Sequence, residues 1–174
     1  MKKYIFIDFD GVLNTERYHA AVLNAGRMLY DAYGPIFDPE AVENLRTVVD
    51  TAGAECVISS SWKLDGPKRM SALWKARKMP GILAGCTPNA VVGMDILSMN
   101  LDDSDTFAQL AGNGCEVKKW LEENAPAEAD SYRYVIFDDV PDSLPEQEAK
   151  FIQVNPHVGI TVEDAARAII ILNK

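Results

Sequence analysis

The sequence predicts an α/β fold, built as a doubly wound, Rossmann-like and mostly parallel sheet with helices on both faces. Short apolar runs of the kind that form buried parallel strands recur along the chain. Amphipathic segments with helix-starting signals alternate with these runs. Several of the apolar runs end directly in acidic or hydroxyl side chains. In open α/β sheets such ends line the ligand site.

The first predicted strand covers residues 4–7 and delivers two acids, Asp8 and Asp10, into a turn that begins at Gly11. Side chains two positions apart on an extended chain point the same way, so both carboxylates are expected at the carboxyl edge of the sheet. Gly11 allows the chain to turn sharply there. Two close like charges indicate a shared proton or a bound cation, and helix-capping acids are the alternative. Oxygen ligands favour Mg²⁺ as that cation.

A helix is predicted over residues 39–52, because Asp38 is a good N-cap, Pro39 suits the first helical position and Gly53 suits the end. Between Asp10 and the next strand, the sequence predicts little beyond a loop and this helix. No large cap domain is therefore expected.

The second predicted strand, residues 56–58, ends in three serines and Lys63. Hydroxyls and a cation at a strand end suit a bound phosphate, although serines also cap helices. Residues 63–78 then concentrate six cations, which indicate a solvated helix face or, alternatively, a rim that attracts anions. They are Lys63, Lys68, Arg69, Lys75, Arg77 and Lys78.

Less can be inferred from residues 81–114. Residues 81–83 are a candidate strand, whereas no structure is assigned to 87–114, whose acidic run 102–105 resembles a loop. The helix that follows carries Trp120, which its helical spacing places in the core.

A further strand, residues 134–137, runs into the acidic pair Asp138 and Asp139, although two acids before a proline can simply form a turn. Another strand is predicted over 151–154, and Thr161 begins the last helix with a capping-box pattern. In a parallel sheet, the acids after the first strand, the serines after the second and this acidic pair would all lie at one edge.

Composition limits the possible functions. The 174 residues, 48% of them hydrophobic, predict a single domain over 1–174 with one substantial core. A net charge of −9 argues against broad nucleic-acid binding. No apolar run is long enough for a signal core or a membrane span, so a cytoplasmic location is expected. The three cysteines lack paired spacing and are expected to be reduced.

The motifs resemble those of the haloacid dehalogenase (HAD) superfamily. Asp8-Phe9-Asp10-Gly11 matches the first motif, Ser59 or alternatively Ser60 the second, and Asp138-Asp139 the fourth. The stretches DFDGVLN, VISSSWK, EVKKWL and YVIFDD further resemble capless HAD domains associated with RNA-repair proteins, and this likeness covers nearly the whole chain.

The resemblance implies a magnesium-dependent phosphomonoester hydrolase. Asp8 would form an aspartyl-phosphate and Asp10 would act as general acid and base. Asp8, Asp10 through its backbone carbonyl, and Asp139 would hold Mg²⁺, with Asp138 in an outer role. Gly11 and the serines at 59 and 60 would contact phosphate. Nucleic-acid ends, nucleotides or other small phosphoesters are the implied substrates.

One departure concerns the third motif, a Lys or Arg that binds the phosphoryl group, because Asn113 occupies its position. Lys63 and Lys118 are the candidate replacements. A catalytically impaired domain that binds metal and phosphate without turnover is therefore the alternative function. A receiver-type signalling domain fits less well, because its phosphoacceptor Asp lies at a mid-chain strand end, where this chain has Ser59.

Overall fold

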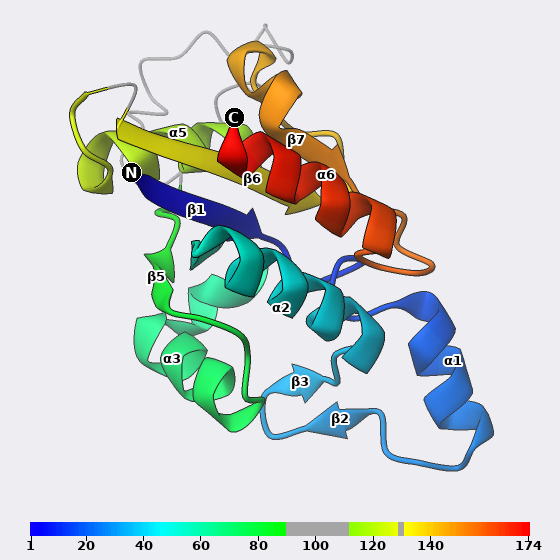
Figure 1. The fold of residues 1–174 in the computed structure, drawn as a ribbon. Coiled ribbons are helices and arrows are strands. Elements are labelled where there is room, and N and C mark those ends of the chain that lie inside the picture. Colours follow the sequence, from blue (N-terminus) through cyan, green and yellow to red (C-terminus); the bar gives the residue numbers. More distant parts are fainter. Residues whose placement is uncertain (90–111, 129–130) are drawn as a thin grey trace, which may run out of the picture.

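The fold was analysed in a computed structural model, which describes residues 1–89, 112–128 and 131–174. A parallel sheet of five strands forms its centre, in the order β5-β4-β1-β6-β7 (Figure 1). The strands are β1 (Lys2–Ile7), β4 (Glu55–Ile58), β5 (Leu83–Cys86), β6 (Tyr132–Asp138) and β7 (Phe151–Gln153). The predicted α/β architecture with a mostly parallel sheet is confirmed.

Helices cover both faces of the sheet, as predicted. Helices α2 and α6 lie side by side over one face, and α5 lies over the other (Figure 1). Alternate residues of β1 divide between the two apolar cores: Ile5 and Ile7 face the α2 and α6 side, whereas Tyr4 and Phe6 pack with Trp120 of α5. The helices are α1 (Glu16–Asn24), α2 (Pro39–Ala52), α3 (Pro67–Ala76), α5 (Asn113–Asn124) and α6 (Val162–Asn173).

The predicted helix signals operate as expected. The side chain of Asp38 accepts a hydrogen bond from the Glu40 amide, and Gly53 ends α2 in the left-handed conformation with φ of 65°. Thr161 begins α6 with a capping box shared with Asp164. Each cap satisfies backbone groups that would otherwise lack partners at the helix end.

The segment between Asp10 and β4 is richer than predicted. It holds α1 and a short antiparallel hairpin, β2 (Tyr30–Asp31) and β3 (Gly34–Pro35), in addition to α2. Helix α1 buries only Val22, so its apolar pattern was too weak to read, and the hairpin strands are too short for an alternating pattern. Neither element amounts to a large cap, and that prediction is confirmed for the part of the chain that the structure describes.

The candidate strand at 81–83 was placed too early, since β5 begins at Leu83. Gly81 has φ of +67° and so forms the turn before the strand. The acidic run 102–105 lies outside the described residues. Two 3₁₀ helices, η1 (Ser61–Asp65) and η4 (Pro145–Lys150), complete the described elements.

The strand order places a natural ligand site beside β1. The chain continues from β1 to β4 and β5 on one side, then returns to β6 and β7 on the other. The connections diverge between β1 and β6, and such a switch point leaves a crevice at the carboxyl ends of the strands.

Within the same described ranges, none of the helices combines the length and apolar character needed to cross a bilayer.

Candidate active site

Three carboxylates meet at the switch point. Asp8 follows β1, while Asp138 ends β6 and Asp139 follows it, and each offers an oxygen within 4.8 Å of the others. The edge is shared because β1 and β6 are parallel neighbours, with Ile7 opposite Phe137. The structure thus brings together three of the acids that the sequence singled out.

Burial and nearby negative charges work against ionisation of Asp8 and Asp138. Burial, reinforced by the charges of Asp8 and Asp139, raises the pKa of Asp138 from 3.8 to about 6, against two hydrogen bonds that lower it. Burial also raises the pKa of Asp8, reinforced by Asp10 and Asp139, while hydrogen bonds from Ser60 and the Phe9 amide lower it. A divalent cation would relieve this repulsion, and three close hard oxygen donors fit Mg²⁺.

Gly11 has a steric role in this cluster. Its φ is +70°, and a Cβ atom there would lie 2.6 Å from Oδ2 of Asp139 and 2.9 Å from Cβ of Pro156. Glycine therefore allows the turn after β1 to approach Asp139 closely.

Asp10 lies outside the three-acid group. Its carboxylate is exposed and accepts two hydrogen bonds, at 2.7 Å from Nδ2 of Asn14 and at 2.9 Å from Nε1 of Trp62. The metal role that the resemblance implies for Asp10 involves its backbone carbonyl and not this carboxylate.

The serines that follow β4 differ in their surroundings. Ser60 is buried and its side chain hydrogen-bonds Asp8. The Ser59 hydroxyl is also buried, and it has no hydrogen-bond partner within the described residues. A buried donor without a partner is costly, so Ser59 is suited to a ligand or an ordered water. The exposed Ser61 lines a hollow with Asp8.

That hollow, of about 240 Å³, brings Lys63 close to Asp8. It is lined by Asp8, Ser61, Lys63, Leu64, Asn89, Asn113 and Glu116. Lys63 forms a buried ion pair with Glu116 and donates to the Ser59 carbonyl at 3.1 Å. Thr87 donates to the same Glu116 oxygen at 3.2 Å. Lys63 is thus a cation held in place by an acid from another element.

Lys118, the other predicted replacement cation, is placed elsewhere. It pairs with Glu146 at 3.7 Å on the surface and lines a separate hollow that contains none of the three acids. The structure therefore brings only Lys63 of these two lysines to the acids.

Asn113 contacts the acids directly. Its Nδ2 donates to Oδ2 of Asp138 at 2.8 Å, and its backbone N–H donates to Asp142 at 2.9 Å. The Val140 amide donates to the other oxygen of Asp138. Asn113, which the motif resemblance places at the position of a cation, thus orients a carboxylate instead.

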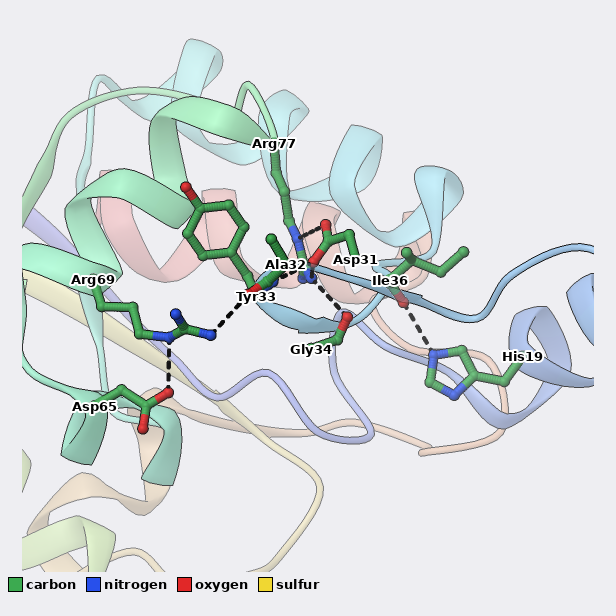
Figure 2. Close-up of polar contacts among 9 residues, drawn as sticks. All are labelled: His19, Asp31, Ala32, Tyr33, Gly34, Ile36, Asp65, Arg69 and Arg77. Atoms are coloured by element: carbon green, nitrogen blue, oxygen red, sulfur yellow. Dashed lines mark hydrogen bonds and ion pairs between the residues drawn. The ribbon is translucent and has the colours of Figure 1, made fainter.

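The basic stretch after the serines divides in two. Arg69 and Arg77 hold the β2–β3 hairpin: Arg77 pairs with Asp31, and Arg69 donates to the Ala32 carbonyl at 2.9 Å (Figure 2). Lys68 and Lys75 line a shallow hollow on α3. Much of the charge in this stretch is thus structural.

Several residues at the site were not predicted, among them Asn14, Trp62 and Glu116. Asn14 lies in the turn that begins at Gly11. The local sign of its contact with Asp10 is a polar residue four positions after that acid. Trp62 and Glu116 contact the site from 52 and 53 positions away in the chain. No local pattern marks such a contact.

We expect Asp138→Asn to stabilise the metal-free protein. Folding raises the pKa of Asp138, so the folded state binds this proton more tightly than the unfolded chain, and the free energy of unfolding falls as pH rises from 3.8 to about 6. At pH 8 with chelator, the variant should gain on the order of 2 kcal/mol, with no gain below pH 4. The Asn113 amide can turn to accept from the new side chain.

Denaturant unfolding at pH 4 and pH 8, in chelator, measures this effect. Asp50→Asn is the control, because it removes one negative charge from the exposed side of α2. An equal change in the free energy of unfolding for both variants, at pH 4 and at pH 8, would contradict the prediction.

Comparison with known proteins yields one match. Residues 4–165 match the family described as the HAD domain in Swiss Army Knife RNA repair proteins. Searches of curated proteins and of solved structures found no match.

Proposed function

The chain belongs to the family of HAD domains in Swiss Army Knife RNA repair proteins, as its motifs predicted, and from this premise we propose that it is a magnesium-dependent phosphomonoester hydrolase. The observation that carries the proposal is the meeting of three carboxylates, at the switch point of the sheet, beside a hollow lined with a hydroxyl and Lys63. Phosphoryl transfer needs this combination of a nucleophile, a place for a cation and positive charge for the phosphate oxygens.

Asp8 is the proposed nucleophile. Within the described residues, it is the member of the acidic cluster that lines the hollow, whereas both oxygens of Asp138 already accept hydrogen bonds from protein groups. An Asp8 oxygen forms a bond to phosphorus as the bond to the leaving oxygen breaks. Asp10 gives a proton to that leaving oxygen, then takes one from the water that hydrolyses the aspartyl-phosphate. Asp8 and Asp10 are thereby restored.

Asp8, Asp139 and the backbone carbonyl of Asp10 are the proposed Mg²⁺ ligands, with Asp138 as an outer partner held by Asn113. When bound, Mg²⁺ supplies positive charge that offsets repulsion between the Asp8 carboxylate and the phosphate oxygens. The raised pKa values of Asp8 and Asp138 support this assignment, because a cation bound here would stabilise both carboxylates in their ionised form.

Lys63 is the proposed phosphate-binding cation in place of the missing third-motif residue. It lines the same hollow as Asp8, and Glu116 holds its ammonium group. Ser59, Ser60 and Ser61 supply the neighbouring hydroxyls. Lys118 has no part in this proposal.

Phosphorylated nucleic-acid ends are the proposed substrate class, and small phosphoesters are the second candidate. The family's association with RNA repair supports the first, as does the lack of a large cap over the described site. The net charge of −9 limits broad electrostatic binding, so recognition would be confined to the end of the strand.

Phosphate release tests the function directly. We expect magnesium-dependent release from a 3′- or 5′-phosphorylated oligonucleotide and from an aryl phosphate, and none in chelator. Binding of Mg²⁺ and a phosphate analogue without turnover would instead support the impaired domain that Asn113 suggests. The preferred substrate would distinguish nucleic-acid ends from small phosphoesters.

A further inference from the structure

We propose that Trp62 is a positioning residue that orients the Asp10 carboxylate for proton transfer, a role that rests on the proposed phosphatase function. The indole Nε1 of Trp62 donates to Oδ2 of Asp10 at 2.9 Å, and Nδ2 of Asn14 donates to Oδ1 at 2.7 Å. Both carboxylate oxygens are thus held by different donors. Each keeps a second lone pair, which leaves room for the proton that Asp10 must carry.

The two donors come from different parts of the chain. Asn14 belongs to the same turn as Asp10, and its side-chain oxygen accepts from the Gly11 amide at 3.1 Å. Trp62 lies in η1, after the neighbouring strand β4. The indole therefore fixes the turn after β1 relative to the loop after β4, which a contact within the turn cannot do.

The Trp62 ring is itself held firmly. Its ring meets Phe9 edge to face, with centroids 5.5 Å apart, and lies 6.0 Å from the ring of Phe37. The Arg77 guanidinium lies 5.7 Å from the centroid of the Trp62 ring. A Cβ atom at Gly34 would lie 2.9 Å from a carbon of the same ring. With these groups around the ring, Trp62 is better suited to hold Asp10 than to stack on a substrate base.

The β2–β3 hairpin forms one wall of this pocket for the indole. Figure 2 shows that Arg69 and Arg77 reach from α3 to the hairpin, where Arg77 pairs with Asp31 and donates to the Gly34 carbonyl at 3.2 Å. The contact between Gly34 and the indole then links the hairpin to Asp10 through Trp62. The element that the sequence did not reveal thus supports the site.

A misplaced Asp10 should affect substrates unequally. Asp10 gives its proton to the leaving oxygen as the P–O bond breaks, so proton transfer matters most for a basic alkoxide. A nitrophenolate leaves with little protonation. Loss of orientation should therefore slow the reaction more for the substrate with the basic alkoxide leaving group. A general loss of structure would slow the reactions of both substrates alike.

The test compares kcat/KM, which reports the steps up to formation of the aspartyl-phosphate, on two substrates for Trp62→Phe, which keeps an aromatic ring and removes the N–H donor. We expect kcat/KM to fall about 10-fold to 100-fold for a 3′-phosphorylated oligonucleotide and less than about 3-fold for nitrophenyl phosphate. The affinity for a phosphate analogue should change little, because Trp62 orients a proton donor and does not bind phosphate. Equal losses on both substrates would overturn the proposal.

Trp74→Phe is the matched control. Trp74 is buried in α3, and its Nε1 has no hydrogen-bond partner within the described residues, so the same substitution removes no donor from the site. Any effect of this variant should be equal on both substrates. Gly34→Ala is a second test variant: its Cβ would meet the indole and its φ of +128° would strain the hairpin, and the resulting displacement of Trp62 should reproduce the unequal loss.

Hydrogen exchange of the Trp62 indole N–H, followed by NMR, tests the contact without turnover. We expect protection in the wild type and its loss in Asp10→Ala, with the Trp74 and Trp120 signals unchanged. Unprotected exchange of the Trp62 indole N–H in the wild type would show that its hydrogen bond to Asp10 is absent. Absence of turnover by the wild type would overturn the proposed function and with it the proton-transfer role, while the exchange result still decides the contact.

Discussion

Asp8→Asn is expected to abolish magnesium-dependent phosphate release, with a loss on the order of 10⁴-fold or more, as for removal of other catalytic nucleophiles. The amide is nearly isosteric with the carboxylate, and its oxygen can still accept from the Phe9 amide, which donates at 2.7 Å. It cannot form a stable bond to phosphorus. Because the substitution removes one charge from a crowded acidic cluster, we expect no loss of folding stability.

Phosphate release and trapping of a labelled phosphoenzyme measure this effect. Asp139→Asn is the matched comparison, because it weakens the proposed metal site and leaves the nucleophile intact. Raising the Mg²⁺ concentration should restore part of its activity but none of that of Asp8→Asn. Unchanged release by Asp8→Asn, or label bound to that variant, would contradict the nucleophile assignment.

The second large effect concerns the buried ion pair of Lys63 and Glu116. Lys63→Met should reduce kcat/KM by about 10²-fold to 10³-fold, the typical cost of losing one donor to a developing charge. It should also destabilise the fold by about 3–5 kcal/mol, because Glu116 is left buried and without its cation. The two losses have different causes and can be separated.

The double variant Lys63→Met/Glu116→Gln separates them. Replacing the carboxylate removes the unpaired charge, so we expect stability to return and activity to stay low. Lys118→Met is the control, since its exposed pair with Glu146 should contribute less than about 1 kcal/mol and nothing to turnover. Denaturant unfolding and phosphate release, measured on all three variants, check the prediction. Recovery of activity in the double variant would exclude Lys63 as the phosphate-binding cation.

The helix ends and most strands could be predicted because their signals are local. Asp38, Gly53 and Thr161 act on backbone groups within a few residues of themselves, so the sequence pattern is enough to locate α2 and the start of α6. The hairpin and α1 could not be predicted in the same way. The hairpin is held by contacts such as that of Arg77 with Asp31, 46 residues apart in the chain, and α1 buries only Val22.

The sequence by itself determined the parallel α/β class, the family, and the arrival of Asp8 and Asp139 at one sheet edge. Apolar runs specify buried strands, and parallel strands bring their ends together. Only the tertiary structure placed Lys63, and not Lys118, in the hollow with Asp8, set Trp62 on Asp10 and brought Gly11 against Asp139. Local patterns specify backbone conformation, whereas the choice of partner depends on where loops from different strands meet.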